Sequence, residues 1–117
     1  MNQALHALII EDHKLVAALV EDCLKELGFT SFDFADCHAD AVAAALRNLP
    51  DLIIADDKLA EGTGLGAVTV IRESRHIPVV FASAEPERIA KLEPGAITIS
   101  KPFSMDQFKT AVAAAMA

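Results

Sequence analysis

Acidic residues stand in pairs directly after two apolar runs of the sequence. Glu11-Asp12 follows LHALII, and Asp56-Asp57 follows LIIA. Carboxylates that lie close together repel one another, and Mg²⁺ compensates such charge well because it takes oxygen ligands and keeps several waters. A carboxylate beside Mg²⁺ can also attack phosphorus and form an aspartyl phosphate. The two pairs therefore indicate a metal site with phosphoryl-transfer chemistry.

Two further polar residues follow apolar runs later in the chain: Ser83 after VVFA and Lys101 after ITIS. A hydroxyl, an ammonium and a metal ion each give a phosphoryl group one partner, and phosphoryl transfer depends mainly on such positioning and neutralisation. Taken singly, Ser83 is equally explained as a helix cap, Lys101 as a surface lysine and the aspartates as turn residues. The functional interpretation depends on all of them meeting at one edge of the fold.

The elements that must position these residues alternate between strand-like and helix-like segments. Short apolar runs predict strands, and apolar residues at i, i+3, i+4 and i+7 predict helices. The strands are expected at 4–10, 31–35, 52–55, 78–82 and 96–100, and the helices at 14–27, 39–49, 64–73, 86–92 and from Ser104 onward. Gly28 is expected to end the first helix, and Gln107 to complete a capping box with Ser104. Five βα units in this order predict an α/β fold with a parallel sheet, in which ligands bind at the carboxyl ends of the strands.

The composition limits the class of protein. A chain of 117 residues fits one domain, and a net charge of −7 disfavours direct binding to nucleic acid, which requires a basic surface. The apolar runs are too short to span a membrane, and the N-terminus lacks the features of a signal peptide, so we expect a cytoplasmic protein without a membrane partner. Cys23 and Cys37 are expected to be reduced thiols, with Cys23 on the apolar face of a helix.

The segments LIIEDH, PDLIIADDKLAEGTG, IPVVFASAE and ISKPF carry all of these residues. They resemble the response-regulator receiver domains of two-component signalling, the CheY-like family, and the resemblance extends over essentially the whole chain. It implies a flavodoxin-like (βα)5 fold with a five-stranded parallel sheet in the order 2-1-3-4-5. It also implies a single receiver domain over residues 1–117 without an output domain. VVFASAEPER, LAEGTGLGAV and ITISKPF are similar to the receiver half of the alphaproteobacterial general-stress regulators, the PhyR family.

The resemblance implies a role for each acidic residue of the expected site. Asp56 looks like the phosphoacceptor, and Asp12 and Asp56 are expected to bind Mg²⁺ through their side chains. Glu11 would act mainly through a metal-bound water, and Lys58 would offer its backbone carbonyl to the metal. Asp57 alternates to the other side of the strand, where a solvent-facing or structural role is expected.

The resemblance also implies the partners of the phosphoryl group. Ser83 looks like the switch hydroxyl, and Ala84 is expected to offer its backbone N–H. Lys101 looks like the lysine that pairs with the phosphoryl group, and the bond from Lys101 to Pro102 is expected to be cis.

Three features depart from the usual pattern of the family. Ala60 stands where a proline is usual, Thr98 occupies the switch position where an aromatic residue is common, and the helix at 86–92 is short. The switching face, formed by this helix, the strand at 96–100 and the last helix, is therefore expected to signal without the usual aromatic residue. Lys58 and Glu85 are expected at the mouth of the site, either as an ion pair that slows hydrolysis of the phosphoryl group or as two solvated side chains.

The sequence therefore predicts a phosphoacceptor protein of a two-component system or phosphorelay, and not an enzyme beyond its own phosphorylation and dephosphorylation. Its expected partners are a histidine kinase or histidine phosphotransfer protein and an output protein on the switching face, in keeping with general stress signalling. Two alternatives stay open, namely a pseudo-receiver that only scaffolds an interaction and a Mg²⁺-dependent phosphohydrolase. The haloacid-dehalogenase type of hydrolase needs an aspartate two residues after the nucleophile, and Lys58 stands there.

Overall fold

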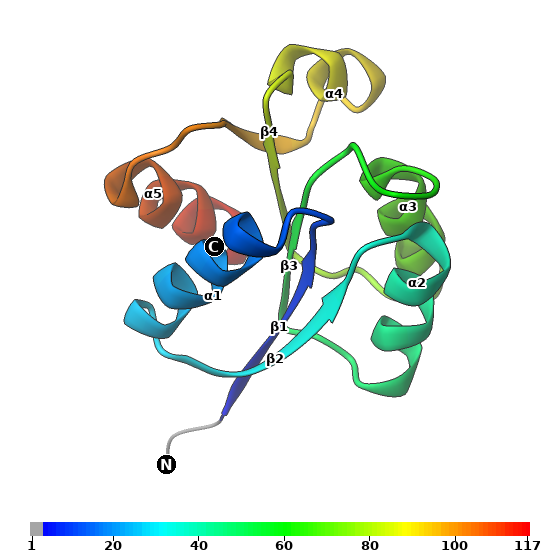
Figure 1. Cartoon of the computed structure of the whole chain (residues 1–117), viewed down its shortest axis with the longest axis horizontal. Helices are drawn as coiled ribbons and strands as arrows, with labels where there is room; N and C mark the ends of the chain where they lie inside the picture. The colour runs from blue at the N-terminus through cyan, green and yellow to red at the C-terminus, as the bar shows by residue number, and fades with distance from the viewer. Residues whose placement is uncertain (1–3) are drawn as a thin grey trace.

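The computed structural model describes residues 4–117, which form a parallel sheet between two layers of helices (Figure 1). The strands are paired in parallel in the order β2-β1-β3-β4-β5, so the expected fold class and strand order are confirmed. In chain order the elements are β1 (Leu5–Ile10), α1 (Lys14–Glu26), β2 (Phe29–Ala35), α2 (His38–Arg47), β3 (Leu52–Ala55), α3 (Gly64–Ser74), β4 (Val79–Ser83), α4 (Pro86–Leu92), β5 (Ile97–Ser100) and α5 (Met105–Met116).

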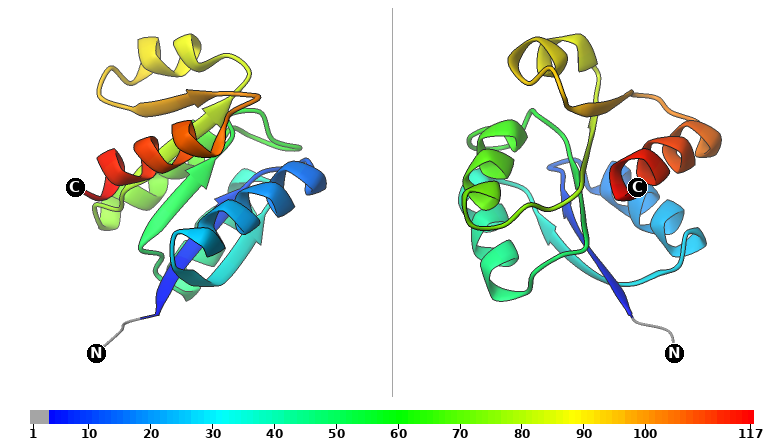
Figure 2. Two further views of the ribbon diagram at one scale, coloured as in Figure 1. Left: turned by 90° about the vertical axis from the view of Figure 1, so that its left-hand side faces the viewer. Right: turned by 180° about the vertical axis from the view of Figure 1, so that it is seen from behind.

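The two faces of the sheet are covered by different helices. Helices α1 and α5 pack on one face, and α2, α3 and α4 lie on the other side, with α4 beside β4 and β5 (Figure 2). Alternate residues of a strand enter different cores: Ile54 of β3 packs on the α1 and α5 side, and Ile53 packs on the opposite side. Because β3 is buried on both faces, it has no polar alternation, which explains its uniformly apolar sequence.

The limits of two elements differ by two residues from the expected ones, for local reasons, and the other limits agree to within one residue. Strand β2 begins at Phe29, two residues early, because the Phe29 side chain is buried in the core beneath α1. Helix α2 ends at Arg47, two residues early. Leu49 precedes Pro50, and a residue before proline is disfavoured in the helical conformation, so the chain leaves the helix ahead of it.

Other local expectations are confirmed. Gly28 follows α1 with a φ of 100°, a left-handed conformation that glycine adopts without strain. Ser104 and Gln107 form the expected capping box at the start of α5. Cys23 is buried on α1, and both Cys23 and Cys37 are free thiols. Within residues 4–117, no helix combines the length and the apolar character needed to cross a bilayer.

Candidate functional site

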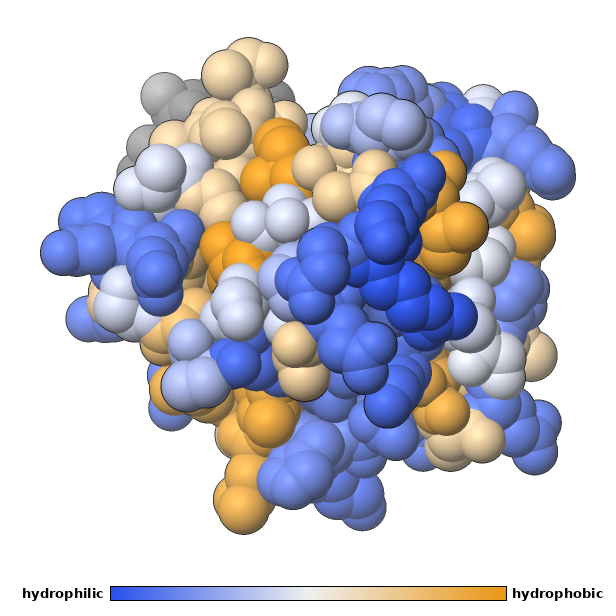
Figure 3. Space-filling view, turned by 90° about the horizontal axis from the view of Figure 1, so that it is seen from above, coloured by the Kyte–Doolittle hydropathy of each residue, from blue (hydrophilic) through white to orange (hydrophobic). Residues whose placement is uncertain are grey.

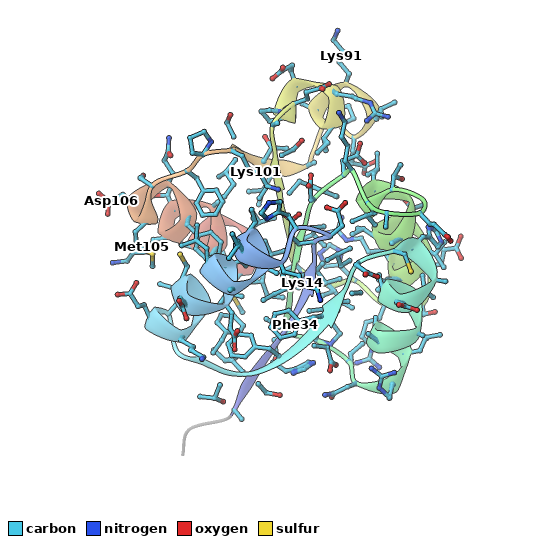
Figure 4. The ribbon with its side chains drawn as sticks, viewed as in Figure 1. Lys14, Phe34, Lys91, Lys101, Met105 and Asp106 are labelled. Carbon is cyan, nitrogen blue, oxygen red and sulfur yellow. The ribbon has the colours of Figure 1, made fainter. Side chains whose placement is uncertain are left out.

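The register of the parallel sheet brings the expected site residues to one edge. Ile10 of β1 lies opposite Ala55 of β3, so the acidic pairs that follow them emerge side by side. On the other side of β3, Ser83 at the end of β4 pairs with the last residue of β5, and the backbone N–H of Lys101 donates to the carbonyl of Ser83 at 2.9 Å. The carboxyl ends of four strands thus carry the carboxylates, the hydroxyl and the ammonium together. Lys101, which supplies the ammonium, is labelled in Figure 4.

Glu11, Asp12 and Asp56 form one acidic cluster, with one carboxylate oxygen of each within 4.8 Å of the others. Glu11 is buried, Asp56 is half-buried and Asp12 is exposed, so the cluster opens to solvent on the Asp12 side. A donor set made of carboxylates alone, with an open side for water, fits Mg²⁺, which prefers oxygen ligands and keeps part of its hydration shell. The residues therefore fit the metal that the sequence indicates.

Lys101 neutralises this cluster from the side of β5. Its Nζ atom lies 2.5 Å from Glu11 Oε1 and 3.0 Å from Asp56 Oδ2. Burial raises the pKa of Glu11, although the hydrogen bond from Lys101 opposes that shift. Burial also disfavours the charged form of Lys101, but its hydrogen bonds to Glu11 and Asp56 outweigh burial and raise the Lys101 pKa. The ammonium is therefore held in its charged form between the two carboxylates, and the expected cis bond to Pro102 is present.

A small pocket of about 70 Å³ adjoins Asp56. Ser83, Ala84 and Lys101 line one side of it, as expected. The Ser83 hydroxyl accepts a hydrogen bond from the backbone N–H of Glu85 at 3.0 Å, which fixes it at the turn into α4. The pocket is several times smaller than the roughly 300–1,000 Å³ of a pocket for a drug-sized ligand, so it suits a small tetrahedral group rather than an organic substrate.

Asp57 lies beside this pocket and has a structural role. The residue is only 3% exposed, so the solvent-facing role left open for it is wrong and the structural one is supported. Its Oδ2 atom accepts a hydrogen bond from Arg88 at 2.6 Å, and its Oδ1 atom lies 3.4 Å from the backbone N–H of Leu65. Arg88 belongs to the first turn of α4, so the pair fastens that helix to the loop after β3. No pattern in the sequence indicates Arg88, because no short-range spacing marks a contact across 31 residues.

Arg88→Ala is expected to lower the free energy of unfolding by about 1–2 kcal/mol, because it leaves the buried Asp57 carboxylate without its charged partner. Lys91→Ala on the same helix is the matched control: Lys91 points away from the domain (Figure 4), and its removal is expected to change stability by less than about 0.5 kcal/mol. Urea unfolding of the two variants measures the difference. An equal loss of unfolding free energy in both variants would contradict the structural role assigned to the Asp57–Arg88 pair.

The loop after β3 approaches its neighbours closely at two positions. The backbone N–H of Ala60 donates to the carbonyl of Asp36 at 3.2 Å. The proline that is usual in the family has no N–H, so alanine at this position exchanges a rigid ring for a hydrogen bond. A Cβ atom on Gly64 would lie 1.9 Å from the backbone oxygen of Asp56, so glycine is required next to the expected phosphoacceptor.

Three of the expected residues lie at the margin of the site or outside it. Lys58 Nζ lies 3.7 Å from Glu85 Oε1, with both side chains largely exposed, so the expected pair is present at the mouth of the pocket. The metal-binding role of the Lys58 carbonyl stays a prediction. Thr98 lies on β5, where it lines a groove against α5 rather than the pocket at Asp56.

Viewed from the end that carries α4, the surface is mainly hydrophilic, and hydrophobic residues appear in small separate groups (Figure 3).

A doubly wound α/β fold with three carboxylates and a lysine at the carboxyl ends of its strands defines the class of CheY-like receiver folds. The sequence matches the response regulator receiver domain over residues 7–113, and the chain belongs to that family. Its members are signalling proteins rather than enzymes as a rule, and magnesium and phosphorylation are typical of them.

Relatives of this chain include PhyR proteins of several bacteria. The chain is 38% identical over 107 residues to the phyllosphere-induced regulator PhyR of Methylorubrum extorquens, an alignment that covers 87% of this chain and 40% of that protein. The solution structure of the PhyR receiver domain of Erythrobacter litoralis matches with a TM-score of 0.88 at 30% identity, covering 97% of this chain and 90% of that one. The anti-anti-sigma factor PhyR of Bartonella quintana matches with a TM-score of 0.84 at 33% identity, covering 99% of this chain and 49% of that one. The chain thus spans half or less of the two longer relatives, and the expected similarity to PhyR receivers is confirmed.

Proposed function

We propose that this receiver domain is phosphorylated on Asp56 by a histidine kinase or a histidine phosphotransfer protein. The observation that carries the proposal is that Asp56, alone among the carboxylates of residues 4–117, belongs both to the acidic cluster and to the pocket lined by Ser83 and Lys101. Asp57 also borders the pocket, but its carboxylate is already engaged by Arg88. Asp56 is therefore the carboxylate placed to receive a phosphoryl group.

The chemistry of the transfer follows from these positions. An oxygen of Asp56 forms the bond to phosphorus while the bond from phosphorus to the imidazole nitrogen of the donor breaks, and the imidazole leaves with a proton from solvent. Asp12 and Asp56 would hold Mg²⁺ directly, Glu11 through a water and Lys58 through its carbonyl. When bound, the metal neutralises charge on the phosphoryl oxygens.

The phosphoryl group then changes the partners of the site. It adds a charge of roughly −1.5 to −2 beside carboxylates that already share one lysine. Lys101 gains a stronger acceptor than Glu11, and Ser83 and Ala84, which line the same pocket, would offer a hydroxyl and a backbone N–H. These contacts draw the loop between β4 and α4 toward Asp56, and with it the switching face of α4, β5 and α5. An output protein that binds this face would sense the change, and the likeness to PhyR points to a partner in general stress signalling.

Phosphotransfer from a panel of histidine kinases and histidine phosphotransfer proteins tests the proposal, with Asp56→Ala as the control. A pseudo-receiver that acts as a scaffold is the second candidate, because Thr98 replaces the aromatic residue at the switch position. A titration with Mg²⁺ followed by NMR separates the two functions. Shifts centred on Asp12 and Asp56 are expected for a phosphoacceptor, and their absence would favour the scaffold.

Lys58→Ala is expected to shorten the lifetime of the phosphorylated state, because the pair with Glu85 stands where the hydrolytic water must enter. The decay of phosphorylated protein, compared with that of the Lys91→Ala control, measures this effect. Equal decay rates would show that Lys58 and Glu85 are two solvated side chains without a role in the lifetime.

A further inference from the structure

A groove of about 460 Å³ lies between α1 and the edge strand β2, and it adjoins the acidic cluster, whose Glu11 and Asp12 also line it. Its walls are small or apolar: Ala17 and Ala18 on α1, and Phe34 and Ala35 on β2. The groove exists because the side of α1 that faces β2 carries alanines, which leave space between the helix and the strand. Lys14 and Phe34 mark its position at the start of α1 and near the end of β2 (Figure 4).

Phe34 is an unusual residue for this position. The residue is 51% exposed, whereas Phe29 of the same strand is 2% exposed and Phe32 packs against the core. Single exposed hydrophobic residues are common, and Leu15 and Leu46 are more exposed still. Phe34 differs from these leucines because it borders a hollow, and aromatic side chains next to hollows supply much of the binding energy of protein interfaces.

The rim of the groove is strongly acidic. Asp36 and Asp40 lie on the side of α2, Glu21 lies on α1, and Lys14 is the only basic residue among those that line the groove in the described part of the chain. Glu21 is paired with Lys25 within its own helix, at 3.3 Å. Asp36 and Asp40 have no lysine, arginine or histidine within ion-pair distance among residues 4–117. Their charge is therefore available to a partner, and a concave surface lined by one sign of charge concentrates its field.

We propose that this groove binds a basic, amphipathic segment of a partner protein. Lysine or arginine side chains of that segment pair with Asp36 and Asp40, and one of its apolar side chains packs on Phe34 and the alanines. The negative charge of the groove favours a basic segment over a second copy of this chain, a nucleic acid or an anionic lipid surface. A second copy of this chain also carries a net charge of −7, and nucleic acids and anionic lipid surfaces have the same sign as the rim. The proposal does not depend on phosphorylation of Asp56.

The test uses two synthetic peptides of about fifteen residues, a length at which an amphipathic helix can form. One consists of leucine and lysine in a helical pattern, and the other has serine in place of every leucine and therefore the same charge. Binding is followed by NMR of the labelled domain in about 0.15 M salt, which screens weak long-range attraction. The leucine-lysine peptide is expected to shift the amide signals of Ala18, Phe34 and Asp36, and to bind more tightly than the serine-lysine peptide.

Variants of the groove decide whether binding is specific. Phe34→Ser is expected to weaken binding of the leucine-lysine peptide about tenfold and to leave that of the serine-lysine peptide unchanged. Asp36→Asn with Asp40→Asn, at two exposed positions, is expected to weaken both peptides without affecting the fold. Leu46→Ser, which removes another exposed apolar side chain, is the matched control and should change neither affinity. Equal affinity of the two peptides, or an unchanged affinity after Phe34→Ser, would show only general attraction to an acidic surface and would overturn the proposal.

Discussion

Asp56→Asn is expected to abolish phosphorylation of the domain. The amide that replaces the carboxylate is a poor nucleophile toward phosphorus, and loss of a nucleophile lowers catalytic rates on the order of 10⁴- to 10⁶-fold in enzymes where it has been removed. The same substitution takes one charged oxygen from the acidic cluster, so the affinity for Mg²⁺ is expected to fall as well. Phosphate incorporation from acetyl phosphate and binding of beryllofluoride, both in the presence of Mg²⁺, measure the two effects.

Asp57→Asn is the informative control for this experiment, because the two aspartates are adjacent in sequence and differ in their partners. The Asp57 carboxylate is engaged by Arg88, and asparagine keeps an oxygen that can accept a hydrogen bond from the guanidinium. We expect Asp57→Asn to lower stability but to accept phosphate. Phosphorylation of Asp56→Asn at the wild-type rate, or its loss only in Asp57→Asn, would show that the phosphoacceptor has been assigned to the wrong residue.

The parts of the site that depend on strand register could be predicted from the sequence. Parallel strands have their carboxyl ends at the same edge of the sheet, so a carboxylate that directly follows an apolar run is expected to lie at that edge. Glu11, Asp56 and Lys101 were predicted to meet for this reason, and they do. Helix ends with strong local signals, such as the capping box at Ser104, follow from chemistry within a few residues and were predicted equally well.

The parts that depend on side chains from distant elements could not be predicted in this way. Alternation along β3 placed Asp57 on the other side from Asp56 but did not say what would cover it, and its partner Arg88 comes from another helix. The groove beside Phe34 depends on the distance between α1 and β2. The alanines at 17 and 18 leave room for a groove, but their presence in the sequence does not predict one. The hydrogen bond of Ala60 is a similar case, because its acceptor belongs to the loop after β2.

Lys101→Met is expected to lower the free energy of unfolding by about 2–4 kcal/mol at neutral pH without Mg²⁺, because it leaves two carboxylates that are mostly buried without a shared cation. Glu11 and Asp56 side chains are 5% and 12% exposed, so water compensates them poorly. The pKa of Glu11 is already raised by burial and rises further without the lysine hydrogen bond. A carboxyl group whose pKa is higher in the folded state than in the unfolded state stabilises the fold at pH values below its unfolded pKa. That contribution is lost as the pH rises through the pKa of the folded state. The deficit of Lys101→Met is therefore expected to shrink as the pH is lowered toward the pKa of Glu11.

The same variant is expected to bind Mg²⁺ more tightly than the wild type, although it is less stable without the metal. The Lys101 ammonium occupies oxygens of Glu11 and Asp56 that a cation would share, so its removal ends a competition. Saturating Mg²⁺ should then restore part of the lost stability, since a ligand that binds only the folded state stabilises it by mass action. Urea unfolding with and without Mg²⁺ measures both effects, with Lys91→Met as the exposed control. If Lys101→Met unfolds like the wild type and binds Mg²⁺ with the same affinity, the lysine does not hold the cluster together, and its contact with Asp56 is incidental.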